Sequence, residues 1–461
     1  MSPSKTTEVQ SHLFHQFGRS GVPASGLLRA LSDRAFLTAA LERVRSSDGA
    51  ATPGPDGVTA EEFAAPGGDG VARLERELRD GSWHPAEPRW FRIGKGAEGQ
   101  REIGILNVRD RVVHTGLKQL LEPLLEPRFH PHSFGYRPGR SVPAALERLC
   151  TLLAGRGGKL PAYGHALPLD VVDCFPSIDQ GLLLAGLRTR IDDREFLDTV
   201  RRAIACGAGS RRRWLRRRPT GLVQGSALSP LLSNQFLDAL DRRLERRSVD
   251  SKRRFHFLRY SDDVLLLATG PDELERARRQ ATAAARRLGL ELQSSRGSAL
   301  QAEHGIPWLG VEVRARRLGW ESEPTFGYHV PDPKVESMLE RIAEMTEPPS
   351  SRLDAAAVQL GPWIRSLNEQ LRSWHQAYDR ADNARAVFAG IDRRARERMG
   401  ALLRSVLGKG WAEVEKRHGT TTARGFPTYA VDGTRLVVLS SLAPRSAHNL
   451  IRRPAWARAA A

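Results

Sequence analysis

The chain has 461 residues, of which 71 are Lys or Arg and 53 are Asp or Glu, and its net charge is +18. This length exceeds what one ordinary hydrophobic core serves, so we expect several domains or subdomains. With 40% hydrophobic residues the composition excludes a disordered chain, and the positive charge favours a polyanionic partner such as nucleic acid, with a solvated basic surface as the alternative.

Residues 1–50 are predicted to form an N-terminal helical extension. Apolar side chains recur at helical spacing between Leu27 and Leu41, which indicates a packed amphipathic helix. The first residues lack the basic and then apolar layout of a signal peptide, and no apolar run in the chain approaches about 18 residues. We therefore expect a cytoplasmic protein with no membrane partner.

Residues 51–330 show a mixed pattern of strands and helices. A loop rich in Pro and Gly at 52–58 leads into a cap and a helix start. Helical sequence follows at 108–127 and again between the later strands. Strand signals appear at 90–105, where a basic glycine-containing turn interrupts them, at 166–173 and at 256–268. This alternation predicts an α+β fold.

Strand signals fade after about residue 330. Residues 331–410 are dominated by helical periodicity rich in Arg, Ala, Leu and Glu, which predicts a separate helical domain. The remaining segment, 411–461, is basic at its end and carries no motif that indicates a role, although a strand is expected at 435–439.

Two acid-bearing strands carry the candidate chemistry. Asp262 and Asp263 lie between two hydrophobic runs, and Asp170 follows an apolar run in another strand. Adjacent carboxylates near a dry core repel each other and are costly unless cations neutralise them. Hard oxygen ligands on two neighbouring strands suit a pair of magnesium ions, which could activate a hydroxyl and stabilise a departing phosphate. A surface turn rich in Asp is the alternative.

Around these acids, several segments in order along the chain resemble the motifs of group II intron-type reverse transcriptases. The similarity covers about residues 50–400 and rests on 53–58, 101–113, 132–141, the strand that carries Asp170, the segment GLVQGSALSPLLSN at 221–234, and the YSDD box at 260–263. The resemblance implies a right-hand polymerase, with fingers and an antiparallel palm sheet in 51–330 and an α-helical thumb or maturase-like domain in 331–410. It also implies an RNA-directed DNA polymerase that adds dNTPs to a primer 3′-hydroxyl on an RNA template, with two Mg²⁺ ions, or Mn²⁺ in their place.

The same resemblance assigns roles to individual residues. Asp170, Asp262 and Asp263 would be the catalytic metal ligands, and the Val171 backbone carbonyl would complete a metal shell. Phe175 would be the steric gate that excludes a 2′-hydroxyl, with an ordinary core position as the alternative. The remaining nucleotide contacts would come from Lys95, Arg101, Gln224 and Gly225, where the two cations grip the triphosphate and the glycine permits close approach. For Lys95 and Arg101 a solvated surface charge is the alternative.

A further set of residues is expected to contact nucleic acid. Six arginines lie between 211 and 218, where their density favours phosphate binding, although a solvated charge run is the alternative. The strand turn that steadies the primer and the thumb helix complete the set, which comprises Arg211, Arg212, Arg213, Trp308, Gly310, Arg365 and Arg372. For Trp308 a core position is the commoner role.

The chain also departs from the family pattern. Ser261 stands where intron enzymes usually have Ala, Glu102 and Val223 stand where Pro is common, and Arg296 stands where a lysine is expected as proton donor to pyrophosphate. Because arginine is a poor acid, Arg296 is expected to stabilise negative charge instead. None of these changes removes a metal ligand, so they indicate a diverged lineage.

Two other uses of such a chain stay open. It could be a host-adopted reverse transcriptase for phage defence, DNA repair or CRISPR spacer acquisition, or an RNA-binding intron maturase that acts as a splicing factor. Its RNA partner would then be a structured intron or another non-coding RNA. The three cysteines, Cys150, Cys174 and Cys206, form no CxxC pair, which argues against a disulfide framework, a cysteine zinc site and a typical HNH endonuclease domain.

Overall fold

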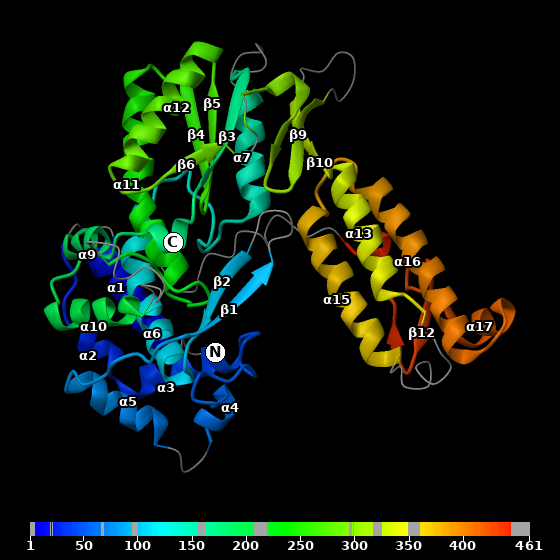
Figure 1. Ribbon diagram of the computed structural model, residues 1–461, viewed down its shortest axis with the longest axis horizontal. Coiled ribbons are helices and arrows are strands. Elements are labelled where there is room, and N and C mark those ends of the chain that lie inside the picture. Colours follow the sequence, from blue (N-terminus) through cyan, green and yellow to red (C-terminus); the bar gives the residue numbers. More distant parts are fainter. Residues whose placement is uncertain are drawn as a thin grey trace. The chain divides into compact units, whose positions relative to one another are not determined.

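The structure is a computed structural model that describes residues 5–18, 20, 22–65, 69–94, 100–154, 162–206, 219–294, 297, 299–316, 325–348 and 360–443. These residues fall into two compact units (Figure 1). Unit 1 holds the described residues up to 141 and from 165 to 299, and unit 2 holds those from 142 to 164 and from 300 onward. None of the described helices is long and apolar enough to cross a membrane.

Unit 1 begins with helices packed around one buried helix. That helix, α6 (Val108–Leu125), continues into the 3-10 turn η3 (Glu126–Arg128) and is buried on most sides, which matches the helix predicted at 108–127. Around it lie α1 (Lys5–Leu13), the π-helical turn η1 (Phe14–Gly18), α2 (Leu27–Leu31), α3 (Arg34–Arg45), α4 (Ala60–Phe63) and α5 (Gly70–Arg79). The predicted cap before α4 is present, because Thr59 and Glu62 form a reciprocal capping box.

A two-stranded hairpin follows these helices in unit 1. Strands β1 (Arg89–Gly94) and β2 (Gln100–Ile105) pair antiparallel, with Ile93 opposite Arg101. This confirms the strand pair expected from the alternating pattern at 90–105. Most side chains of the hairpin are exposed.

The central sheet of unit 1 is antiparallel. Its strands run in the order β4 (Phe255–Tyr260), β5 (Asp263–Ala268), β3 (His165–Val171) and β6 (Leu292–Ser294). The long helices α11 (Ser229–Asp250) and α12 (Pro271–Arg286) pack against it (Figure 1). Between β3 and α11 in the sequence lie the helices α8 (Cys174–Ser177), α9 (Gln180–Arg188) and α10 (Arg194–Ala205). Burial of the apolar strands under these helices gives the sheet its core.

Unit 2 combines helices with two small sheets. It contains α7 (Val142–Ala154), β7 (Leu300–Gln301), η5 (Ala302–His304), a sheet ordered β10 (Thr325–His329), β9 (Val311–Arg316), β8 (Ile306–Trp308), and the helices α13 (Asp332–Met345), α15 (Leu360–Tyr378), α16 (Ala384–Leu407) and α17 (Trp411–His418). A second sheet, β11 (Gly419–Thr421), β12 (Pro427–Val431) and β13 (Thr434–Arg435), precedes η6 (Leu439–Ser441).

The strand expected at 435–439 is wrong beyond its first residue. The chain leaves β13 after Arg435, and side chains take over the hydrogen bonds that a sheet would supply. Asn368 Nδ2 donates to the Arg435 carbonyl at 2.8 Å and Asn368 Oδ1 accepts from Val437 N at 2.7 Å, while Asp392 accepts from Leu439 N. These helix side chains satisfy the buried backbone, so the apolar run needs no neighbouring strand.

Candidate active site

The two tandem aspartates lie at a tight hairpin between β4 and β5, called here the tandem-aspartate turn (residues 260–263). Tyr260 and Asp263 face each other as the last paired residues, so Ser261 and Asp262 alone form the loop. Ser261 has a φ of 58°, a left-handed conformation that two-residue hairpins require and that L-residues adopt at a cost. The turn therefore needs support from its surroundings.

The sheet register brings Asp170 to the same turn. In the antiparallel pairing of β3 with β5, Asp170 lies directly opposite Asp263, and Val171 N donates to the Asp262 carbonyl at 3.2 Å. Side chains at directly opposite positions share one face of a sheet, with Cβ atoms about 5 Å apart. All three aspartates are partly exposed. The two acid-bearing strands thus bring the three carboxylates to one end of the sheet.

The donors at this end of the sheet suit a hard divalent cation. Carboxylate and backbone carbonyl oxygens are the ligands that Mg²⁺ prefers. The three carboxylates are not drawn tightly together: among the described residues, the group of His, Cys, Asp or Glu ligand atoms that all lie within 4.8 Å of one another is His130, His132 and Glu245. Like charges repel at short range, so bringing three carboxylates close together requires a cation.

The negative charge of the aspartates affects the pKa of a neighbouring thiol. Cys174 follows β3 at the start of α8 and is buried. Burial, and after it the charge of Asp262, raises the pKa of the Cys174 thiol to about 12. The thiol is therefore neutral near pH 7 and is no candidate nucleophile.

A buried arginine supports the tandem-aspartate turn through hydrogen bonds. Arg259 on β4 is buried, and its guanidinium donates to both Asp241 oxygens, at 2.8 and 2.6 Å. Its Nη1 also donates to Asn234 Oδ1 at 3.0 Å and to the Ser261 carbonyl at 2.8 Å. Burial opposes the charged form, but the Asp241 carboxylate raises the pKa of Arg259 above its ordinary value. A charged side chain in the core thus orients the turn that carries Asp262.

A glycine lets another segment approach the same turn. Asn234 Nδ2 donates to the Gly135 carbonyl at 2.8 Å, and a Cβ on Gly135 would collide with Ser261 N. The backbone of Phe134 also donates to the Arg259 carbonyl at 2.9 Å. Three segments noted for their motifs, 132–141, 221–234 and 260–263, therefore meet at Arg259.

Several predicted nucleotide contacts lie along a path from β3 to the β1–β2 hairpin. Val171 is the buried last residue of β3, and Phe175 in α8 is partly buried against the core. The Phe175 carbonyl accepts from Leu222 N at 3.0 Å, which joins α8 to the segment that carries Gln224.

Gln224 and Gly225 then lie against β2. The Gln224 carbonyl accepts from Gly104 N at 2.8 Å. Gly225 is exposed with a φ of +109°, and a Cβ there would lie 2.8 Å from the Gly104 carbonyl oxygen, so this close approach needs glycine. Arg101 on β2 is exposed, while Lys95 lies outside the described residues.

The residues expected to contact nucleic acid fall mostly outside unit 1. Trp308 in β8 is buried, Gly310 forms the exposed left-handed turn into β9, and Arg365 and Arg372 are exposed on α15, all in unit 2. The burial of Trp308 agrees with a core role. Three more of them, Arg211, Arg212 and Arg213, lie outside the described residues, as does Arg296.

Arg259, Asp241 and Asn234 were not predicted as site residues from the sequence. A signal was present, because a lone arginine inside an otherwise apolar strand needs a buried anion. The pair His130 and His132, two positions apart, was not predicted as a site either.

Comparison with known proteins places residues 93–313 in the family described as "Reverse transcriptase (RNA-dependent DNA polymerase)". Protein YkfC of Escherichia coli is 32% identical over 231 residues, which cover 50% of this chain and 59% of that protein. Group II intron-encoded protein LtrA of Lactococcus lactis subsp. cremoris is 28% identical over 205 residues, which cover 44% of this chain and 32% of that protein. A solved structure of telomerase from Candida albicans aligns with a TM-score of 0.41 and 13% identity, covering 72% of this chain and 64% of that one.

The matched segment spans less than two thirds of the length of these two relatives. It includes the strands that carry Asp170, Asp262 and Asp263, the helix α11, and the β2 strand against which Gln224 lies. With its antiparallel central sheet and packed helices, the chain has the α+β fold of a reverse transcriptase, and its residues 93–313 match the reverse transcriptase family and are similar to group II intron-encoded proteins.

Proposed function

We propose that the chain is an RNA-directed DNA polymerase that adds dNTPs to a primer 3′-hydroxyl on an RNA template and releases pyrophosphate. The observation that carries this proposal is the register of β3 with β5, in which Asp170 lies opposite Asp263 and beside Asp262. Phosphoryl transfer needs mainly positioning and charge neutralisation, so a few carboxylates on rigid strands suffice.

In this proposal the three aspartates and the Val171 carbonyl hold divalent cations. Two Mg²⁺ ions, or Mn²⁺ in their place, would supply hydroxyl activation and stabilise the negative charge that develops on the leaving group. The protein contributes rigidity: the buried Arg259 holds the Ser261 carbonyl, and the β3 backbone holds the Asp262 carbonyl. Because the backbone that carries the ligands is fixed by these contacts, it needs little reorganisation when substrate binds.

The incoming nucleotide would occupy the path from Phe175 to β2. Phe175 would act as the steric gate below the sugar, and Gly225 would let the nucleotide approach the backbone. Gln224 supports this reading, because its Oε1 is shielded from solvent and has no hydrogen-bond partner within the described residues. Arg101 and Lys95 would bind the triphosphate as cationic donors.

RNA template and primer are the proposed macromolecular partners. The net charge of +18 and the exposed Arg365 and Arg372 support phosphate binding. Arg211, Arg212 and Arg213 would add to it, and Trp308 with Gly310 would steady the primer strand. We infer a cytoplasmic site of action from the sequence.

The decisive experiment is primer extension by the full-length chain on an annealed RNA template with Mg²⁺. Asp263→Asn should lower the rate by at least about a thousandfold, since it removes several kcal/mol of charge stabilisation at the metal site. Asp173→Asn is the matched control, because Asp173 is exposed, lies three residues after Asp170 and has a φ of 44°, which asparagine tolerates. RNA binding measured by filter retention should be unchanged in both variants. Primer extension that survives Asp263→Asn would refute the proposal.

A second candidate function is that of an RNA-binding intron maturase. The likeness to an intron-encoded protein favours it, as do the exposed Arg365 and Arg372 of α15. The same Asp263→Asn variant separates the two, because a maturase role requires RNA binding and splicing assistance but no carboxylate triad. Host-adopted roles in phage defence, DNA repair or spacer acquisition would retain the polymerase chemistry and differ only in template.

A further inference from the structure

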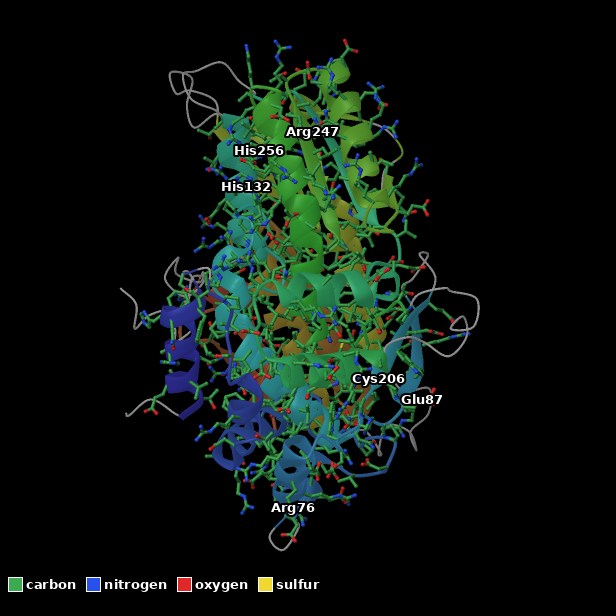
Figure 2. All side chains as sticks on the ribbon, turned by 90° about the vertical axis from the view of Figure 1, so that its left-hand side faces the viewer. Arg76, Glu87, His132, Cys206, Arg247 and His256 are labelled. Carbon is green, nitrogen blue, oxygen red and sulfur yellow. The ribbon has the colours of Figure 1, made fainter. Side chains whose placement is uncertain are left out.

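A compact group of histidines and a glutamate lies in unit 1 apart from the tandem-aspartate turn. His130 lies two residues before the 132–141 segment, His132 is the first residue of that segment, and Glu245 lies on α11. One ligand atom from each of the three lies within 4.8 Å of the other two, and His130 Nε2 is 3.7 Å from Glu245 Oε2. Figure 2 shows His132 beside His256 of β4, whose ring centroid is 4.3 Å from that of His132.

Backbone and ring contacts hold both imidazoles in place. The His132 carbonyl accepts from Arg259 N at 2.8 Å, and His130 N donates to Asp238 Oδ1 at 3.0 Å. The His130 ring also packs against Phe257, with centroids 5.0 Å apart. The backbone hydrogen bonds hold the two residues in place, and the packing on Phe257 limits the movement of the His130 ring.

The two carboxylate oxygens of Glu245 differ in their contacts. Its Oε1 pairs with Arg253 Nη2 at 2.9 Å. Its Oε2 is shielded from solvent and has no hydrogen-bond partner among the residues that the structure describes. A shielded carboxylate oxygen without a donor is costly unless a cation neutralises it. Desolvation lowers the pKa of His130, which favours the neutral imidazole that binds metals.

We propose that His130, His132 and Glu245 form a Zn²⁺ site. Two imidazole nitrogens and one carboxylate oxygen are a ligand set that zinc accepts, and three protein ligands leave a fourth position for water. Ligand atoms about 2.0–2.1 Å from a tetrahedral ion lie about 3.4 Å from one another, close to the 3.7 Å between His130 Nε2 and Glu245 Oε2. Small side-chain movements therefore complete the site.

The hydrogen bond from His132 N determines which ring nitrogen of His130 carries the proton. Its Nδ1 accepts from His132 N at 3.2 Å, so in the metal-free chain the imidazole proton sits on Nε2. When zinc binds Nε2, that proton moves to Nδ1 and the bond from His132 N is lost. The bound ion would tie the segment before Gly135 to α11, and its nitrogen ligands distinguish it from the all-oxygen aspartate site.

The test uses the full-length chain, stripped with a chelator and titrated with Zn²⁺ in millimolar Mg²⁺, which keeps the aspartate site filled. Calorimetry and metal analysis should give one tightly bound zinc ion per chain. His132→Gln and Glu245→Gln should each weaken this binding by about a hundredfold, since loss of an outer contact alone costs about ten- to a hundredfold. Substituted Co²⁺ should give the visible absorption of a tetrahedral site.

Arg253→Gln is the matched control, because it removes the Arg253–Glu245 ion pair and keeps all three ligands, so zinc binding should persist. Thermal melting answers the concern that a variant fails to fold: zinc should raise the melting temperature of the unmodified chain and leave that of Glu245→Gln unchanged. Failure of the unmodified chain to take up stoichiometric zinc would overturn the proposal. Uptake that is equal in the chain and in both ligand variants would overturn it too, whatever the polymerase activity.

Discussion

The buried ion pair of Arg259 with Asp241 offers a test of how the tandem-aspartate turn is held. Both side chains are 1% exposed, and the guanidinium donates two hydrogen bonds to the carboxylate, at 2.8 and 2.6 Å. Asp241→Asn removes the negative charge and leaves a buried, uncompensated arginine. Removing one partner of such a pair costs about 3–5 kcal/mol. We expect a loss of this size in the free energy of unfolding of unit 1, measured by urea denaturation followed by circular dichroism.

Glu61→Gln is the matched control for this measurement. The Arg45–Glu61 pair has the same 2.6 Å separation as the shortest Arg259–Asp241 contact, but its side chains are 33% and 76% exposed. Because solvent screens such a pair, its loss should leave the urea midpoint nearly unchanged. If both variants shift the midpoint equally, burial does not set the strength of the Arg259 pair and the reasoning fails.

A double variant separates stability from positioning. Arg259→Met with Asp241→Leu replaces the ion pair by apolar side chains, a change that is often neutral in a buried site. We expect most of the lost stability to return. Primer extension should stay low, because the Ser261 carbonyl and Asn234 Oδ1 have lost their donor. Full activity in the stable double variant would show that Arg259 does not position the turn.

Two further predictions concern close packing and pH. Gly135→Ala should reduce the rate of primer extension at least about tenfold, because the added Cβ collides with Ser261 N and moves the tandem-aspartate turn. Gly49→Ala is the control, because a Cβ at Gly49 meets open space. Equal rates of primer extension for the two variants would contradict the collision. Burial raises the pKa of Asp110 from 3.8 to about 6. The folded chain then binds this proton more tightly, so its contribution is full below about pH 3.8 and is lost as pH rises to about 6, a change of about 3 kcal/mol. Urea denaturation across this range should show that Asp110→Asn removes this part of the pH dependence, and identical pH profiles for variant and unmodified chain would contradict the assignment.

The local sequence predicted those elements whose signal is short in range. The apolar runs on either side of the tandem aspartates predict the strands found as β4 and β5, and the alternating residues at 90–105 predict the β1–β2 hairpin. The cap at Thr59 and the long buried helix α6 were also predicted from the sequence. Hydrophobic periodicity and capping chemistry act between residues a few positions apart, so one sequence suffices to detect them.

Partners far apart in the sequence were decided only by tertiary packing. The contact of Arg259 with Asp241 joins residues 18 positions apart, and that of Asn234 with Gly135 joins residues 99 apart. The end of the strand after Arg435 depends on Asn368, 67 positions earlier. No local pattern specifies such pairings, because each depends on which helix covers which strand.

The sequence by itself determined that two apolar strands carry acids and that the chain resembles a reverse transcriptase. The tertiary structure decided that Asp170 faces Asp263, because strand register follows from how the buried faces of β3 and β5 pack and a slip by one residue would turn the acid to the other side. It also decided which anion neutralises Arg259 and which carboxylate meets His130, since burial makes those charges depend on whatever side chains the fold brings within a few ångströms.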